Sequence, residues 1–491
     1  MKFMVVLVYV VMVLLVGYQS MRKTKTVSDY FLGGRNVGPW VSAFAYGTTY
    51  FSAVLFIGYA GKIGWGFGLS SLWIVVGNSI LGTFLAWKFL ARRTREMTIR
   101  LGALTMPQFL ERRYQSVNLK ILSALIIFVF LVPYSASVYM GLSYLFEEVF
   151  GIPFVYALLA MAALTACYLV MGGYTAVTLT DLIQGLVMIF GVVAMLFFVV
   201  KAPQVGSISA AFTKLHEIDP KLVHPIGPPG IVPLASLVVL TSLGPWGLPQ
   251  MIQKFYAIKS EQAIKPAMVV STSFALIITF GAYFTGSLGR LFFPDGMPQI
   301  NGVPNPDVII PGIISTALPE AFQVLILLLV LAASMSTLAS LVLVASSSIG
   351  IDLLGTVAPE FAKKRGVAVM RLLCMLFIAF SVYIAIRPNV IVNLMSISWG
   401  TIAGAFLAPY LYGLFWPKVT KAGAWAGVLS GLFISVGISY FTGLHSSYIP
   451  LISSLAIVVP LAVVPLVSLI TEKFPVWHME KVFGATDAKS I

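Results

Sequence analysis

Hydroxyl side chains interrupt an otherwise apolar stretch at residues 332–348, which reads AASMSTLASLVLVASSS. In a helix, Ser336 and Ser340 share one face, with Ala333 one turn earlier and Thr337 beside them. A small, oxygen-rich face suits a hard cation that takes oxygen ligands, and a dehydrated Na⁺ fits that description. The alternative is a packing seam of small residues between membrane helices, in which Ser and Thr bond to the helix backbone. This stretch alone leaves both interpretations open.

The composition predicts an all-α polytopic membrane protein that lies in a lipid bilayer. Of the 491 residues, 59% are hydrophobic and 10% are charged, which is more apolar sequence than a soluble core needs. We expect about thirteen transmembrane helices, most of about 20 or more residues, the length that crosses the hydrocarbon core. They lie near 3–17, 39–61, 69–90, 119–148, 153–172, 177–200, 231–256, 266–290, 318–350, 367–387, 390–414, 422–442 and 449–471.

The distribution of Lys and Arg predicts the orientation, because basic residues stay in cytoplasmic connections. With the N-terminus outside and the C-terminus in the cytoplasm, 23 of the 31 basic residues fall on the cytoplasmic side and 7 on the opposite side. The cytoplasmic segment 88–118 alone carries Lys88, Arg92, Arg93, Arg95, Arg100, Arg112 and Arg113. The net charge of +14 therefore reflects topology in the cell membrane, which removes the main support for a nucleic-acid partner.

One carboxylate, Asp181, lies well inside an apolar run. A charged side chain at the centre of a bilayer costs about 2.5–3.5 kcal/mol on insertion scales, so a carboxylate there usually faces a cavity or a partner. In the predicted topology, Asp181 and the segment 336–340 lie in the cytoplasmic halves of their helices and can face each other. The alternative is that Asp181 reaches the membrane interface from near its helix end.

Two predicted spans contain features that break a helix. The run 46–52 (YGTTYFS) has a glycine and hydroxyls at mid-membrane, and the run 242–249 (SLGPWGLP) has two prolines that each remove a backbone donor. Irregular backbone at this depth lines a cavity or is buried in protein. Breaks at corresponding positions of two halves indicate the central binding site of a transporter. The alternative is a pair of kinks that only shape helix packing.

Short motifs follow one another along much of the chain. The first half carries Asp29-Tyr30-Phe31-Leu32-Gly33-Gly34-Arg35, Gly172-Gly173-Tyr174-Thr175-Ala176 and Thr180-Asp181-Leu182-Ile183-Gln184. The second half carries Gly247-Leu248-Pro249 before Lys254-Phe255, then residues 333–340, Ser398-Trp399-Gly400, Phe415-Trp416-Pro417-Lys418 and Gly423-Ala424-Trp425-Ala426-Gly427. These motifs and their order resemble the sodium:solute symporter family over residues 29–431.

The resemblance implies a five-plus-five inverted-repeat (LeuT-type) core with one helix before it and two after it. An extra helix would occupy residues 1–20, the first repeat 21–230 and the second repeat 231–414. Two further helices and a cytoplasmic tail would follow in 415–491.

The resemblance also implies an ion site. The hydroxyls of Ser336 and Thr337 and the carbonyl of Ala333 would bind Na⁺ together with the carbonyls of Thr48 and Phe51. In some members the aspartate at the position of Asp181 joins neighbouring serines in a second sodium site. Here Ser340 is present but the adjacent residue is Ala339, which argues against a second ion. Asp181 and Ser340 are the candidate residues for a second ion or for coupling.

For the solute, Tyr134 and Ser52 match positions that line the pocket in the proline-transporting branch. Tyr50, Thr241 and Pro245 depart from that branch, where an aspartate, a tryptophan and a tyrosine stand. The full predicted substrate lining is Thr49, Ser52, Tyr134, Thr241, Trp246 and Gln250, with Trp399 as a gate. Packing in the core is the alternative role for the two tryptophans.

The function predicted is sodium-coupled symport of a small organic solute by alternating access, with Na⁺ as the transported ion. The solute would be a monocarboxylate, a neutral amino acid or a pantothenate-like acid. A proton-coupled symporter that uses Asp181 is the alternative; a membrane-embedded enzyme and a passive channel are less well matched. No phosphate-binding GxxxxGK[ST] motif is present, and we expect no organic cofactor, no nucleic acid and no obligate protein partner.

Overall fold

The computed structural model describes residues 2–21, 31–300, 302–387, 390–442 and 447–484. The first half of the chain forms α1 (Lys2–Met21), η1 (Gly33–Arg35), α3 (Pro39–Tyr50), η2 (Val54–Tyr59), α4 (Ala60–Phe67), η3 (Gly68–Ser71), α5 (Leu72–Val76), η4 (Gly77–Ala91), α6 (Arg92–Arg100), α7 (Met106–Tyr114), α8 (Val117–Phe150), α9 (Phe154–Lys201), α10 (Ile208–Ile218) and η5 (Pro220–Val223).

The second half forms α11 (Ile231–Leu243), η6 (Gly244–Trp246), α12 (Pro249–Ala257), α13 (Ile264–Ser287), α14 (Gly289–Phe292), β1 (Gln299–Ile300), β2 (Val303–Pro304), η7 (Pro306–Val308), α15 (Ile309–Ala317), α16 (Glu320–Ser347), η8 (Ser348–Leu353), α17 (Leu354–Val357), α18 (Pro359–Ala385), α19 (Ile391–Phe415), α20 (Lys421–Leu432), η9 (Phe433–Ile438), α21 (Ser439–Phe441), α22 (Ile449–Ile470) and α23 (Val476–Phe483). The strands β1 and β2 pair as a short antiparallel hairpin.

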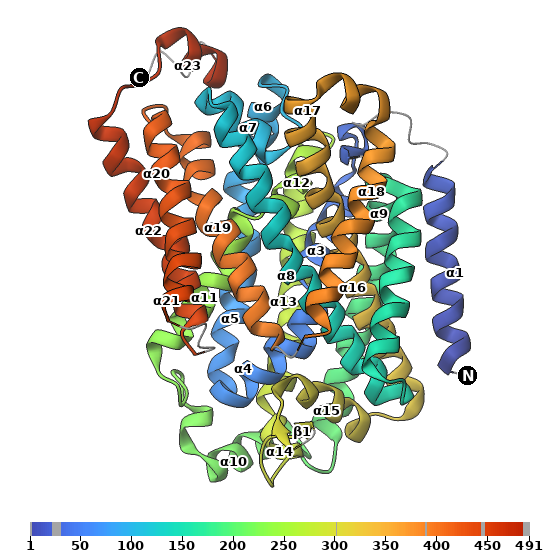
Figure 1. Cartoon of the computed structure of the whole chain (residues 1–491). Coiled ribbons are helices and arrows are strands. Elements are labelled where there is room, and N and C mark those ends of the chain that lie inside the picture. Colours follow the sequence, from blue (N-terminus) through green and yellow to red (C-terminus); the bar gives the residue numbers. More distant parts are fainter. Residues whose placement is uncertain (1, 22–30, 301, 388–389, 443–446, 485–491) are drawn as a thin grey trace.

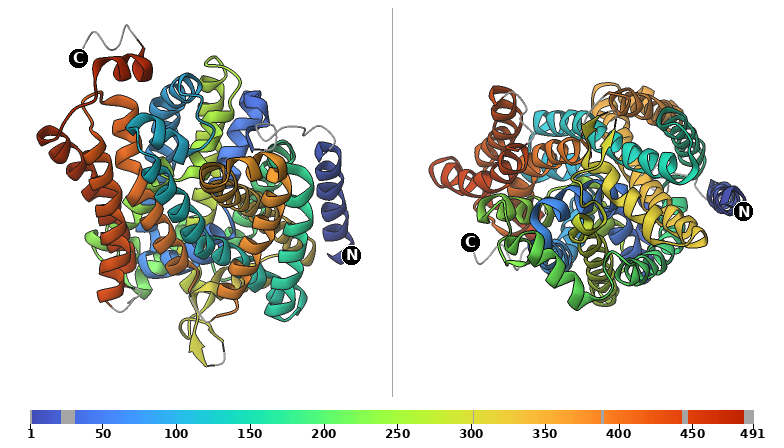
Figure 2. Two further views of the ribbon diagram at one scale, coloured as in Figure 1. Left: turned by 45° about the horizontal axis from the view of Figure 1, so that its top comes forward. Right: turned by 90° about the horizontal axis from the view of Figure 1, so that it is seen from below.

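The long helices lie side by side in one bundle, and the short elements gather at its two ends (Figure 1). One end holds α10, α14, α15 and β1, and we call it the α10–α15 end. The opposite end holds α6, α7, α17 and α23, and we call it the α6–α7 end. Helix α1 starts toward the α10–α15 end and lies at the edge of the bundle, as the view along the helices shows (Figure 2).

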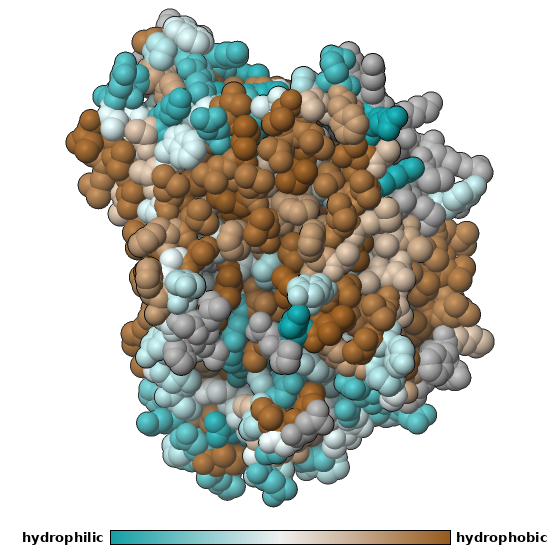
Figure 3. Space-filling model, viewed as in Figure 1, coloured by the Kyte–Doolittle hydropathy of each residue, from teal (hydrophilic) through white to brown (hydrophobic). Residues whose placement is uncertain are grey.

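On the face seen in Figure 3, a belt of hydrophobic residues lies between two more hydrophilic ends of the bundle. The core lies along α16 and α19: 89% and 94% of the residues in their apolar windows are buried, against 33% for the spans of α18 and α20. Helix α3 packs in the centre, in contact with α9, α12, α13 and α16. The surface belt and the buried core together are those of an integral membrane protein.

Ten helices in the described residues are long and apolar enough to cross a membrane, and three shorter apolar segments accompany them. The predicted count of thirteen stays a prediction, because some predicted boundaries fall inside helical stretches. The spans expected at 153–172 and 177–200 both lie in α9. The stretch 54–100 also counts as one span, although the chain turns at Gly68. Gly68 has a φ of +58°, and a Cβ there would lie 2.3 Å from the Leu222 carbonyl oxygen, so the turn requires glycine.

Both predicted helix breaks are confirmed. Helix α3 ends at Tyr50, and Phe51 is extended (φ −110°, ψ 105°) before the chain becomes helical again. Helix α11 ends at Leu243, the short turn η6 follows, and α12 begins at Pro249. The two breaks are buried inside the bundle, which satisfies the requirement that irregular backbone be kept away from lipid.

Candidate functional site

The hydroxyls of α16 bond to the backbone that the break in α3 exposes. Ser336 donates to the Thr48 carbonyl at 2.9 Å, and Thr337 donates to the carbonyls of Thr48 and Thr49 at 3.0 and 3.3 Å. Ser336 Oγ also lies 3.1 Å from the Ala333 carbonyl. The last carbonyls of a helix have no partner within it, so the end of α3 at Tyr50 leaves them free to accept these bonds.

This geometry brings together five oxygens that suit a hard cation. Two are hydroxyl oxygens and three are backbone carbonyl oxygens, and all five residues are buried. Four of the five residues predicted for the Na⁺ site, Thr48, Ala333, Ser336 and Thr337, meet here. The fifth, Phe51, donates its N–H to the Gly47 carbonyl and stacks on Tyr50, and among the described residues Thr49 instead of Phe51 supplies the second α3 carbonyl.

A second polar cluster lies one helical turn further along α16. Ser340 Oγ is 3.0 Å from the Thr49 hydroxyl and accepts a hydrogen bond from the ammonium of Lys254 at 3.1 Å. Asp181 of α9 is completely buried and interacts electrostatically with Lys254. The Thr48 hydroxyl faces this carboxylate, yet neither group completes a hydrogen bond with a described residue. The predicted pair Asp181 and Ser340 thus lies beside a lysine.

The position of Lys254 in the structure differs from the position predicted from the sequence. Its position near the end of a predicted span put it among the cytoplasmic basic residues, but its side chain is only 1% exposed and points into the bundle core. The whole of α12, from Pro249 to Ala257, is buried. The sequence signal that was available is the proximity of Lys254 to the α11–α12 break, five residues after Pro249.

A small cavity lies on the other side of the α3 break. It measures about 20 Å³ and is lined by Tyr50, Phe51, Ser52, Val54, Leu55, Tyr59, Asn78, Thr241, Tyr283, Met395 and Trp399. A cavity of this volume holds about one water molecule, so the side chains must move before an organic solute can enter. The Tyr50 hydroxyl donates to the Thr241 carbonyl, which joins the two broken helices across the cavity.

The structure divides the predicted substrate residues into two groups. Ser52, Thr241 and Trp399 line the cavity, and the Tyr134 ring packs edge-on against Trp399 with 5.7 Å between ring centroids. Tyr134 itself and the other three predicted residues lie outside the cavity lining. The Thr49 hydroxyl contacts Ser340, the Trp246 indole donates to the Leu81 carbonyl at 2.9 Å, and Gln250 is buried in α12.

Four polar or aromatic lining residues, Tyr50, Tyr59, Asn78 and Tyr283, were missing from the predicted site residues. Asn78 accepts hydrogen bonds from the hydroxyls of Tyr50 and Ser242, both at 3.3 Å. A lone amide within an apolar span was the available signal, because polar groups at membrane depth usually face a cavity or a partner.

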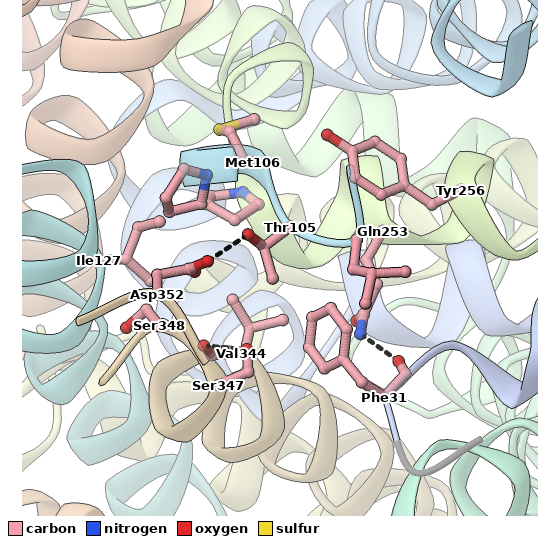
Figure 4. Close-up of a pocket in the computed structure, with 13 residues that line it drawn as sticks. Phe31, Thr105, Met106, Ile127, Gln253, Tyr256, Val344, Ser347, Ser348 and Asp352 are labelled. Carbon is pink, nitrogen blue, oxygen red and sulfur yellow. Dashed lines mark hydrogen bonds between the residues drawn. The ribbon is translucent and has the colours of Figure 1, made fainter. Parts of the chain in front are cut away.

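A second small pocket lies between the polar clusters and the α6–α7 end, and Figure 4 shows the side chains that line it. The pocket measures only about 10 Å³, and there Thr105 donates to Asp352 at 2.7 Å and Gln253 donates to the Phe31 carbonyl at 2.8 Å. Arg113 of α7 fastens the same end by donating to the carbonyls of Gly413 and Trp416. Burial lowers the pKa of Arg113 to about 10, so it stays charged at neutral pH.

Comparisons with known proteins agree with this architecture. The model of the sodium:solute symporter family matches residues 30–431. The osmoregulated proline transporter OpuE of Bacillus subtilis is 30% identical over 448 residues, which cover 89% of each chain. Sodium/proline symporter 2 of Staphylococcus saprophyticus is 30% identical over 443 residues, covering 88% of this chain and 85% of the relative.

Solved structures show the same fold. A Na⁺-coupled sialic acid symporter in a substrate-bound outward-open state superposes with a TM-score of 0.77 at 20% identity, covering 96% of this chain and 99% of its own. A transporter of the nucleobase-cation-symport-1 family gives a TM-score of 0.56 at 14% identity, over 94% of this chain and 99% of its own. The matched family and relatives are transporters, which confirms that the protein is a transporter and not an enzyme. The chain belongs to the sodium:solute symporter family.

Proposed function

We propose that this protein carries a small organic solute across the cell membrane together with Na⁺. The observation that supports this most strongly is the pair of α16 hydroxyls that bond to carbonyls exposed by the break in α3. An ion bound there would be coordinated both by the hydroxyl oxygens of Ser336 and Thr337 and by the α3 carbonyl oxygens that now accept their hydrogen bonds. It would therefore hold α3 and α16 together. Thr48, Ala333, Ser336 and Thr337 are the proposed ligands, with Thr49 or Phe51 supplying a further carbonyl.

The break in α3 also provides a physical route for coupling. Residues 48 and 49 offer carbonyls to the ion, while residues 50–52 line the cavity. An ion that fixes the end of α3 therefore fixes the residues that meet the solute. Because coupling between two binding sites is reciprocal, the solute would raise Na⁺ affinity by the same factor.

The lining of the cavity favours a compact solute with one carboxylate or none. The lining residues include neither Lys nor Arg, so a carboxylate would be met by hydroxyls and by the ends of interrupted helices. Monocarboxylates, neutral amino acids and pantothenate-like acids meet this requirement. Proline is the first candidate to test because relatives transport it, although Tyr50, Thr241 and Pro245 depart from the proline branch.

The proposed orientation places the α6–α7 end in the cytoplasm, with the N-terminus outside. Seven basic residues lie between 88 and 118, and cytoplasmic connections retain Lys and Arg. The proposed repeats are 21–230 and 231–414, preceded by an extra helix in 1–20 and followed by two helices and a tail in 415–491. The first repeat would then begin with the broken helix that contains α3, and the second with the broken helix α11–α12.

Uptake by proteoliposomes tests this function. Radiolabelled proline, a monocarboxylate and pantothenate are supplied with an inward Na⁺ gradient, with equal Na⁺ on both sides, and with a pH gradient alone. We expect one of these solutes to accumulate only with the Na⁺ gradient. Accumulation driven by the pH gradient without Na⁺ would overturn sodium coupling in favour of proton coupling.

A further inference from the structure

The ammonium of Lys254 sits in the centre of the transporter, one helical turn of α16 from the proposed Na⁺ ligands. Its side chain is 1% exposed, donates to Ser340 at 3.1 Å and lies over the Tyr174 ring, 5.1 Å from the ring centroid. A buried cation is costly unless it is compensated, and hydroxyl, aromatic and carboxylate groups all provide compensation here.

The groups around Lys254 are those that a second metal cation would need. Ser340 and Thr49 contribute hydroxyl oxygens 3.0 Å apart. Asp181 contributes a buried carboxylate that forms no hydrogen bond with a described residue and that interacts electrostatically with Lys254. This cluster has the oxygens and the negative charge of a cation site, and a protein ammonium already lies in it.

We propose that Lys254 is a built-in cation that takes the place of a second Na⁺, so that the transporter binds one Na⁺ per cycle. The inference rests on the proposed function, since it assumes that Na⁺ binds at Ser336 and Thr337. The ammonium neutralises Asp181 and repels a metal ion from Ser340, because like charges at this distance in a buried site repel strongly. The proposed site at Ser336 and Thr337 is then the position where Na⁺ can bind.

The position of Lys254 also gives the ammonium a mechanical role. It belongs to α12, the second part of the broken helix, whereas Ser340 belongs to α16 and Thr49 to α3. The contact therefore links three helices that surround the site. A transported Na⁺ would break such a link each time it left, while a covalently attached cation keeps it.

Equilibrium binding of radioactive Na⁺ to the purified protein in detergent, without solute, tests the proposal. We expect the parent to bind one Na⁺ per chain. Lys254→Met, which removes the charge and keeps much of the volume, frees Asp181, Ser340 and Thr49 and should bind two. Lys254→Met combined with Asp181→Asn should return to one. Lys259→Met, a change at an exposed lysine of the next connection, should leave the number unchanged.

The outcomes separate this inference from the proposed function. Two Na⁺ ions bound to the parent would overturn the role of Lys254 while leaving sodium coupling intact. One ion in both the parent and Lys254→Met would also overturn it, and would leave Lys254 as a helix-packing residue. Binding of no Na⁺ by the folded parent would overturn the proposed function itself. If Lys254→Met does not fold, Lys254→Gln, which also removes the charge, takes its place and should bind two ions, whereas Lys254→Arg, which keeps the charge, should bind one.

Discussion

At the scale of single residues, the proposed ion site depends on two hydroxyls of α16 that bond to carbonyls of another helix, α3. Ser334, only two residues before Ser336, shows the contrast, because its hydroxyl bonds the Val330 carbonyl within α16 at 2.6 Å. Back-bonding of this kind is the usual behaviour of Ser in a membrane helix. Ser336 and Thr337 instead reach α3, where a cation can share the same carbonyls.

Removing either hydroxyl should weaken Na⁺ binding. We expect Ser336→Ala and Thr337→Ala each to raise the Na⁺ concentration for half-maximal uptake by about tenfold or more, a loss of about 1.4 kcal/mol. Thr337→Ser keeps the oxygen and should have a small effect. Ser334→Ala is the matched control because its hydroxyl stays within α16. Unchanged Na⁺ dependence in both alanine variants would rule out this site.

Changes in the cavity should act on the solute and leave the ion alone. Tyr134→Ala removes the ring that packs on Trp399, and Thr241→Ala changes the lining directly. We expect both to raise the half-saturation concentration of the transported solute, with Na⁺ affinity measured without solute nearly unchanged. Tyr139→Ala, on the same helix, is the control, because Tyr139 does not line the cavity and, among the described residues, has no ring contact with Trp399 like that of Tyr134. Solute kinetics like those of the parent in both variants would place the binding site elsewhere.

The sequence was informative about these residues to different degrees. Spacing was enough to put Ser336 and Ser340 on one face of a helix, and the family motifs then predicted Thr48 as a partner. The prediction that Lys254 lies in a cytoplasmic connection was wrong, because a buried lysine near the end of a span cannot be told from a loop lysine by its position in the sequence. Asn78 and Tyr283 come from helices that only the three-dimensional packing brings to the cavity.

At the scale of elements, the two broken helices are what make a polar site possible inside an apolar bundle. The prolines and glycines that cause the breaks are visible in the sequence, so the breaks were predictable. Helix boundaries between the breaks were harder to predict. The spans expected at 153–172 and 177–200 lie in one continuous helix, α9, because hydropathy alone does not show whether neighbouring apolar stretches belong to one helix or to two.

Close crossing of α4 and α13 holds the first broken helix in place and can be tested by a single methyl group. A Cβ at Gly286 would lie 1.8 Å from the Ala60 carbonyl oxygen, whereas one at Gly66 would meet nothing within 4 Å. We expect Gly286→Ala to destabilise the protein by about 1–3 kcal/mol, as overpacking does, and Gly66→Ala to have no such cost. Thermal unfolding in detergent measures both. Equal stability would show that α4 and α13 do not approach this closely.

At the scale of the whole molecule, the hydrophobic belt and its two hydrophilic ends determine how the protein lies in the membrane, but not which end is cytoplasmic (Figure 3). Only the excess of basic residues at the α6–α7 end predicts the orientation. With the exposed Cys167 replaced by Ser, a cysteine at exposed Asn118 should resist an impermeant thiol reagent in intact cells, and one at exposed Glu217 should react. The reverse pattern would invert the orientation.

The central claim is that Na⁺ and solute move together, and flux of radioactive Na⁺ driven by the solute measures this most directly. Proteoliposomes with equal Na⁺ on both sides receive an inward gradient of the transported solute. We predict that Na⁺ enters with the solute in the parent and in Ser334→Ala, and that this flux is lost in Ser336→Ala at the same Na⁺ concentration. Solute entry in the parent without any accompanying Na⁺ would contradict sodium-coupled symport.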